Sequence, residues 1–266
     1  MSEKQRYFIE LAYDGTDFHG WQVQPNAVTV QEVLNDALYT VLRQPIETIG
    51  CGRTDTGVHA RDFFLHFDVG STVNSQWSMD KQAIGPGPST IDLIKTANSL
   101  NAILPNTIAI KRIIPVDAEA HARFDATSRS YEYHVHFNKD PFKINHSWQL
   151  RDKPDIALMN AAARIIMEHT DFSCFSKSNT QTYTNNCKIT RAEWVYSKHC
   201  LVFHITADRF LRNMVRAIVG TLMQVGRKEI QPEDVRAIIE SKNRSNAGTS
   251  VPACGLYLTE VKYPYL

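Results

Sequence analysis

The sequence has few of the residues that would mark a disulfide-stabilised or zinc-binding protein. Its five cysteines are an odd number, widely spaced, and no two of them form a C-x-x-C pair. This spacing argues against a disulfide framework and a zinc site, so a reducing cytoplasm is the expected location. His134 and His136 stand two residues apart on one predicted strand, but no third ligand is placed beside them. We therefore expect no bound metal.

Long apolar runs are also missing. No stretch is long enough to span a bilayer, and the N-terminal segment has no signal-like apolar core, so we expect a protein that is neither exported nor embedded in a membrane. The formal net charge is only +1, which means that a polyanionic partner would have to be recognised by a local basic surface. A length of 266 residues with a 43% apolar share allows one large domain or two closely packed ones.

Apolar periodicity predicts the secondary structure. An alternating pattern indicates strands at residues 7–13, 47–51, 63–69, 108–116, 131–137, 188–196, 200–207 and 255–263. A helical period indicates helices at residues 30–42, 93–104, 156–166 and 209–222, with a last helix from Pro232. Thr29 and Thr90 are placed to cap the first two helices.

This order of elements predicts an α+β fold. We expect two similar lobes of mixed, mainly antiparallel sheet flanked by helices, with a central cleft between them. We place the domains at residues 1–115 and 116–266. Residues 70–90 have neither periodicity nor much apolar content, so they are expected to form a surface loop or insertion.

A short polar segment set between two apolar runs that are predicted strands, residues 49–60, is the first candidate site. It has no helical period, and Gly52 and Gly57 allow backbone angles that a side chain would forbid, so we expect a tight loop that presents Asp55. A plain hairpin turn is the simpler alternative, because Asp-x-Gly is common turn chemistry. An aspartic protease is a poor alternative, because Arg53 and Thr54 precede Asp55 and the sequence has no second Asp-Thr-Gly or Asp-Ser-Gly.

A row of arginines is the second candidate. Arg209, Arg212 and Arg216 are three and four residues apart, on one face of the predicted helix 209–222. No acidic residue occurs from Arg209 to Lys228. The row is therefore either a solvated face or a surface that meets an anion from elsewhere.

Three segments resemble, in the same order, the signatures of the TruA-type tRNA pseudouridine synthases: Tyr13-Asp14-Gly15-Thr16-x-Phe18-x-Gly20-Trp21-Gln22-x-Gln24, Gly52-Arg53-Thr54-Asp55-x-Gly57-Val58-His59-Ala60, and Phe210-Leu211-Arg212-Asn213-Met214-Val215-Arg216. The resemblance runs from about residue 7 to the closing Gly255-Leu256-Tyr257-Leu258. It implies the isomerisation of uridine to pseudouridine at positions 38 to 40 of the tRNA anticodon stem-loop. It also implies a cytoplasmic homodimer that binds tRNA in its central cleft and uses no cofactor.

The resemblance assigns roles to four residues. Asp55 matches the catalytic aspartate of the family, and Arg212 matches the arginine that pairs with it. Tyr131 matches the tyrosine that stacks on the target uracil, and Arg53 matches an arginine that contacts the RNA and helps to expel the base. An ionised carboxylate suits a reaction in which the N1–C1′ bond breaks, the base turns and C5 joins C1′. The uridine must first leave its stack.

Two alternatives remain beside this assignment. The chain could be an RNA-binding protein with a vestigial site, or a relative that acts at other uridines or in other RNAs. Arg61-Asp62 stands where many relatives carry a small and polar pair, and the loop at 70–90 is longer than usual, so RNA contacts could differ. The sequence leaves open whether Asp55 attacks the sugar, attacks the base or removes a sugar proton.

Overall fold

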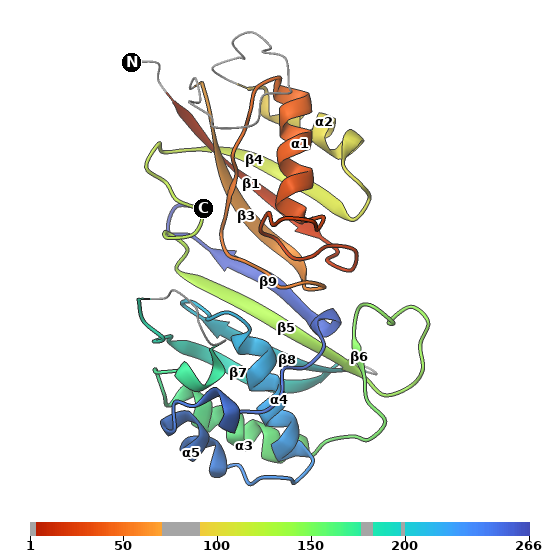
Figure 1. The fold of residues 1–266 in the computed structure, drawn as a ribbon, viewed down its shortest axis with the longest axis vertical. Coiled ribbons are helices and arrows are strands. Elements are labelled where there is room, and N and C mark those ends of the chain that lie inside the picture. Colours follow the sequence, from red (N-terminus) through yellow and green to blue (C-terminus); the bar gives the residue numbers. More distant parts are fainter. Residues whose placement is uncertain (1–3, 71–90, 177–182, 198–199) are drawn as a thin grey trace. The chain divides into compact units, whose positions relative to one another are not determined.

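The structure is a computed structural model that describes residues 4–70, 91–176, 183–197 and 200–266, and Figure 1 shows its helices and strands. The chain divides into two compact units, residues 1–126 and 127–266. The predicted α+β fold with a mixed, mainly antiparallel sheet is confirmed. The domain boundary at 115/116 stays a prediction, and residues 71–90 of the predicted surface loop lie outside the described residues. None of the helices in the described ranges is long and apolar enough to cross a membrane.

The first unit is built on antiparallel strands. Its elements are β1 (Gln5–Tyr13), α1 (Val30–Leu42), β2 (Ile49–Gly50), β3 (His59–Val69), α2 (Leu93–Ile103) and β4 (Ile108–Val116). β1 pairs with β3 on one side and with β4 on the other, and β2 pairs with β3. α1 packs against α2, and α2 packs against β4. The apolar faces of these elements meet in a core that includes Phe8, Ile9, Leu11, Trp21, Leu34, Leu38, Phe63, Leu65 and Phe67.

The helix caps show how local sequence sets these boundaries. The hydroxyl of Thr29 accepts from the amide of Glu32 (3.4 Å), as predicted, and α1 ends at Arg43, whose φ of 58° is left-handed. α2 is capped by Asp92, whose carboxylate accepts from the amide of Lys95 (2.9 Å). The predicted cap, Thr90, lies outside the described residues.

The second unit is centred on β5. Its strands are β5 (Ser128–His136), β6 (Trp148–Gln149), β7 (Ile189–Ser197), β8 (Cys200–Ala207) and β9 (Leu256–Lys262). β5 pairs antiparallel with β8 and β9, β7 pairs antiparallel with β8, and the short β6 pairs parallel with β5, which makes the sheet mixed. Its helices are α3 (Ile156–Met167), α4 (Met214–Gly226), α5 (Asp234–Glu240) and the 3₁₀ turns η1 (Ser173–Phe175), η2 (Arg244–Asn246) and η3 (Ala253–Gly255). α3 packs on β7, α4 and α5 (Figure 1).

The predicted row of arginines on one helix is wrong. α4 begins at Met214, five residues later than predicted, because Asn213 has a left-handed backbone (φ 66°, ψ 4°) that a helix cannot continue. Arg209 and Arg212 therefore precede the helix, and Arg216 alone of the three lies in it. The apolar period misled the prediction, because Leu211 is buried in a turn and not in a helix.

Candidate active site

Asp55 lies in the loop between β2 and β3. Its backbone carbonyl accepts from the amide of Val58 (3.2 Å), which closes a turn around Thr56 and Gly57. Gly57 has a φ of 76°, in the left-handed region that favours glycine, whereas Gly52 has no such angle. The Asp55 side chain is half-buried. The tight loop expected from the sequence is therefore present, although only Gly57 of its two predicted glycines has the backbone angle that a side chain disfavours.

The first sequence motif supports this loop on both sides of Asp55. The amide of Trp21 donates to the carbonyl of Thr54 (3.3 Å), and the amide of Gly57 donates to the carbonyl of Phe18 (3.3 Å). The hydroxyls of Tyr13 and Thr54 are hydrogen-bonded as well (2.9 Å). Residues 13–21 thus fix the backbone that carries Asp55, which gives a physical reason for the two motifs to occur together.

Glycines allow the two segments to approach so closely. A Cβ on Gly15 would lie 2.0 Å from the carbonyl oxygen of Val58, and a Cβ on Gly20, whose φ is 88°, would lie 2.5 Å from the carbonyl oxygen of Thr54. Backbone rests directly on backbone at both points. A site held by its scaffold in this way is pre-organised, because little has to be ordered when a ligand binds.

Tyr131 lies on β5 in the second unit, beside a bulge in the pairing of β5 with β9. The rings of Tyr131 and Phe210 make a T-shaped contact, with the ring centroids 5.1 Å apart and the planes at 89°. This T-shaped geometry is the favoured one for two aromatic rings. Sequence reasoning had given no role to Phe210, although this residue opens the third motif.

Arg212 is exposed and lies between the buried Leu211 and the left-handed Asn213. The side-chain amide of Asn213 donates to the hydroxyl of Ser250. The guanidinium of Arg244 also donates to that hydroxyl (3.1 Å). The backbone next to Arg212 is therefore held by a segment more than thirty residues away in the sequence.

The segment that contains Ser250 is itself fixed to α4. Arg244 donates to the carbonyl of Gly248 (3.1 Å), and the amide of Gly248 donates to the hydroxyl of Thr221 (2.9 Å). A Cβ on Gly220 would lie 1.9 Å from the carbonyl oxygen of Thr249, so the helix and the segment touch backbone to backbone. Sequence reasoning missed these residues, because their contacts are long-range and follow no local pattern.

The four predicted site residues are divided between the two units. Asp55 and Arg53 share one loop of the first unit, where Arg53 is exposed. Tyr131 and Arg212 belong to the second unit. Each pair is described within its own unit, and the joint action of all four remains a prediction.

Two histidines of the second unit, His134 on β5 and His204 on β8, lie near the carboxylate of Glu132. Nε2 of His134 lies 2.9 Å from a carboxylate oxygen of Glu132, on the same strand. Nδ1 of His204 on β8 lies 3.6 Å from the other oxygen of Glu132, and burial lowers the pKa of His204. Glu132, His134 and His204 thus form a polar cluster on the sheet. The expectation of no bound metal stays a prediction.

Comparison with known proteins adds an independent line of evidence. A family model described as tRNA pseudouridine synthase matches residues 162–264. A protein of Parabacteroides distasonis is 47% identical over 260 residues, covering 98% of this chain and 96% of the relative. One from Bacteroides fragilis is 46% identical, covering 98% and 97%, and one from Clostridium acetobutylicum is 35% identical, covering 96% and 98%.

The three relatives match nearly the whole chain, and they confirm the family that the three motifs indicated. The chain belongs to the tRNA pseudouridine synthase family and is an isomerase. The three relatives named above are each called tRNA pseudouridine synthase A, so this is the branch of the family that the sequence resembles.

Proposed function

We propose that this protein isomerises uridine to pseudouridine at positions 38 to 40 of the tRNA anticodon stem-loop, with Asp55 as the catalytic carboxylate and without a cofactor. The observation that carries this proposal is the geometry of the Asp55 loop. Two hydrogen bonds hold this loop, one from the amide of Trp21 and one to the carbonyl of Phe18. Relatives named tRNA pseudouridine synthase A match this chain over almost its full length, and they support tRNA as the substrate.

The reaction needs one carboxylate and no oxidant. The N1–C1′ bond breaks and the C5–C1′ bond forms, while C5 loses a proton and N1 gains one, so atoms and electrons balance within the substrate. Asp55 serves as the nucleophile or as the base in these bond changes. The half-buried position of its side chain suits either role, because a partly desolvated carboxylate interacts more strongly with a nearby substrate.

Tyr131 is proposed to stack on the target uracil. Its ring is half-buried, and the T-shaped contact with Phe210 restricts the orientation of the phenol. A ring fixed in this way can hold a detached uracil while the base turns. Phe210 acts here as a positioning residue, because it reaches the substrate only through Tyr131.

Arg53 and Arg212 are proposed to meet negative charge. Both side chains are exposed. Arg53 stands two residues before Asp55, where a guanidinium could contact the RNA backbone and favour the extruded base. The resemblance in the third motif pairs Arg212 with the carboxylate of Asp55. The next residue, Asn213, is held by its hydrogen bond to Ser250, and this supports a fixed direction for the Arg212 side chain.

We also propose that the protein acts in the cytoplasm as a homodimer. The resemblance to the family supports this assembly, and the absence of a disulfide in the described part of the chain is compatible with a reducing compartment. Light scattering of the purified protein tests the assembly: a mass near twice 30.2 kDa is expected, and a mass near 30.2 kDa contradicts it.

The central experiment maps pseudouridine by position in unmodified tRNA transcripts, with no metal or nucleotide added. Wild type is expected to convert uridines at positions 38 to 40. Asp55→Asn should bind the tRNA but convert none of them, whereas Asp36→Asn, which changes an exposed carboxylate on α1, should behave as wild type.

Other results would contradict parts of the proposal. Conversion only at other uridines would overturn the assignment of positions 38 to 40, but the proposed isomerisation of uridine would stand. A wild-type protein that binds tRNA but converts nothing would overturn the catalytic role and favour an RNA-binding protein with a vestigial site.

A further inference from the structure

Phe124 is an exposed aromatic residue on a connection that is otherwise well ordered by hydrogen bonds. Its side chain is 74% exposed, between β4 and β5 at the end of the first unit. A single exposed apolar side chain is common on protein surfaces, so the case for Phe124 depends on its neighbours and on how its backbone is held. The catalytic proposal gives no role to this residue.

The Phe124 ring has two polar neighbours. The imidazole of His121 lies 4.3 Å away, centroid to centroid, with the planes at 34°. The guanidinium carbon of Arg123 lies 5.6 Å from the ring centroid, within the range of a cation–π contact. The ring is thus largely exposed, with the positive charge of Arg123 over it.

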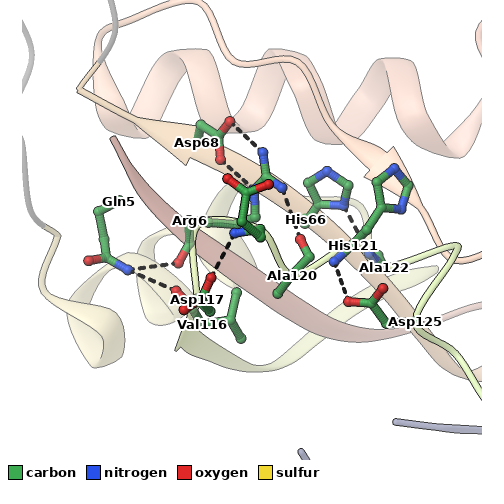
Figure 2. A network of polar contacts seen from close by, with 11 residues as sticks. Gln5, Arg6, His66, Asp68, Val116, Asp117, Ala120, His121, Ala122 and Asp125 are labelled. Atoms are coloured by element: carbon green, nitrogen blue, oxygen red, sulfur yellow. Dashed lines mark hydrogen bonds and ion pairs between the residues drawn. The ribbon is translucent and has the colours of Figure 1, made fainter. Parts of the chain in front are cut away.

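A network of polar contacts holds the connection in place, and Figure 2 shows it. The amide of Ala122 donates to Nδ1 of His66 (3.1 Å), and the guanidinium of Arg6 donates to the carbonyl of Ala120 (2.9 Å). The amide of His121 donates to the carboxylate of Asp125 (2.7 Å). Ala120 and Ala122 are both buried.

The same network is anchored in the sheet. Arg6 on β1 forms two hydrogen bonds with Asp68 on β3, at 2.7 and 2.9 Å (Figure 2). Nδ1 of His121 accepts from the amides of Arg123 (3.1 Å) and Phe124 (3.3 Å). The backbone of Phe124 is therefore fixed, and the exposure of its ring is a built feature of the first unit.

We propose that Phe124 is a stacking platform for an unpaired base of the RNA substrate, with Arg123 facing the adjacent phosphate. An aromatic face accepts any base, and an arginine beside it adds a charge that the backbone of RNA complements. A protein partner would fit this small platform less well, because an apolar ring flanked by a cation offers little area to bury. The proposal rests on the proposed function, since it takes the RNA of that reaction as its ligand.

Pre-organisation strengthens the argument. An aromatic residue on a loose loop would lose backbone entropy when a base stacks on it. The backbone at Phe124 is already held, because the amides of Ala122, Arg123 and Phe124 all donate hydrogen bonds. The platform is distinct from the assigned role of Tyr131, because that tyrosine is proposed to hold the reacting uracil. Phe124 would bind a different nucleotide and affect binding more than the chemical step.

The test measures the Kd for unmodified tRNA and the steady-state kinetics of four variants. Phe124→Ala and Phe124→Leu should raise the Kd and the KM roughly 5- to 100-fold with little change in kcat, because base stacking is lost. Phe124→Trp should bind within about threefold of wild type, because it keeps a flat ring. Phe142→Ala is the matched control: it removes another phenylalanine, 89% exposed and on the second unit, and should leave both constants unchanged.

Salt dependence separates stacking from charge. Phe124→Ala should leave the slope of log Kd against log salt unchanged, because stacking releases no counterions. Arg123→Gln should reduce that slope, because one phosphate contact is lost. Equal urea midpoints for all variants show that the effects are not losses of fold.

The outcomes distinguish this inference from the proposed function. If wild type converts uridine and Phe124→Ala has the wild-type Kd, the platform is overturned and the function stands. The platform also falls if Phe124→Leu binds as well as Phe124→Trp, or if Phe142→Ala weakens binding as much as Phe124→Ala. If wild type binds tRNA without converting it, the proposed function falls, and the Kd values of the variants still decide the platform. A wild type that binds no RNA overturns both.

Discussion

The side-chain amide of Asn213 donates to the hydroxyl of Ser250, and this bond holds a left-handed residue directly after Arg212. A left-handed backbone costs a residue with a side chain about 1–2 kcal/mol, so the surrounding structure must stabilise it. Arg244 adds a second hydrogen bond to the same hydroxyl. The strain is thus placed where it sets the direction in which Arg212 leaves the backbone.

Glycine and alanine at position 213 should therefore behave differently. Both substitutions remove the bond to Ser250, but glycine adopts the left-handed angle freely while alanine does not. Asn213→Ala should be less stable than Asn213→Gly by about 1 kcal/mol in urea unfolding, and its kcat should be the lower of the two. Equal stability and equal kcat for the two variants would contradict the role of the left-handed backbone, and Ser250→Ala isolates the contribution of the hydrogen bond.

Two glycines of the Asp55 region form a second matched pair. A Cβ on Gly15 would lie 2.0 Å from the carbonyl oxygen of Val58, whereas a Cβ on Gly52 would meet nothing within 4 Å. Gly15→Ala should lower the free energy of unfolding by at least about 1–3 kcal/mol, because backbone has to move, and it should impair conversion by shifting the loop. Gly52→Ala should leave stability unchanged or slightly raised. Urea unfolding of both variants checks this, and a stable Gly15→Ala would refute the close approach.

Much of the fold can be predicted from the sequence, because the spacing of apolar residues depends only on neighbours in the chain. The strand at β1 and the helix α1 with its Thr29 cap were predicted at nearly their observed bounds, since the residues that define them are neighbours in the chain. β3 begins at His59, earlier than the predicted residue 63, because its first residues carry the motif and not an alternating pattern. The Asp55 loop was found because its glycines and its carboxylate are adjacent.

The remaining features depend on contacts that no local pattern encodes. The apolar residue Leu211 continues the period of α4, but the left-handed Asn213 breaks the helix, and only a distant partner explains that break. The segment around Ser250 and the contact of Phe210 with Tyr131 are likewise long-range. A sequence read along one dimension has no signal for these pairs.

His66 should make stability depend on pH. Burial, followed by the nearby positive charges of Arg6 and His121, lowers the pKa of His66 from 6.5 to about 4, while Asp68 and Asp125 oppose this shift. Between these values the unfolded chain binds a proton that the native protein does not bind. Stability is therefore fully present above about pH 6.5 and is lost as the pH falls toward about 4, by at most about 3 kcal/mol.

The variant His66→Asn separates this effect from other titrations. The Asn side-chain oxygen can accept from the amide of Ala122, as Nδ1 of His66 does, but it carries no proton to titrate. Urea unfolding across pH 4 to 7 should give a flatter profile for His66→Asn than for wild type. His121 also has a pKa lowered by burial, so some slope should remain. Identical slopes for the two proteins would contradict the assignment to His66.

Tyr131 and Phe210 should be energetically coupled. Their T-shaped contact, with centroids 5.1 Å apart, is of a kind that contributes about 0.5–1.5 kcal/mol beyond burial of area. In a double-mutant cycle of urea unfolding with Tyr131→Leu, Phe210→Leu and the double variant, the interaction energy should fall in that range. Single-variant effects that add within about 0.3 kcal/mol would show no coupling and would remove the structural support for Phe210 as the residue that orients Tyr131. The Phe210→Leu variant, which leaves Tyr131 in place, is expected to convert uridine more slowly than wild type, because the phenol ring of Tyr131 is no longer held from the side.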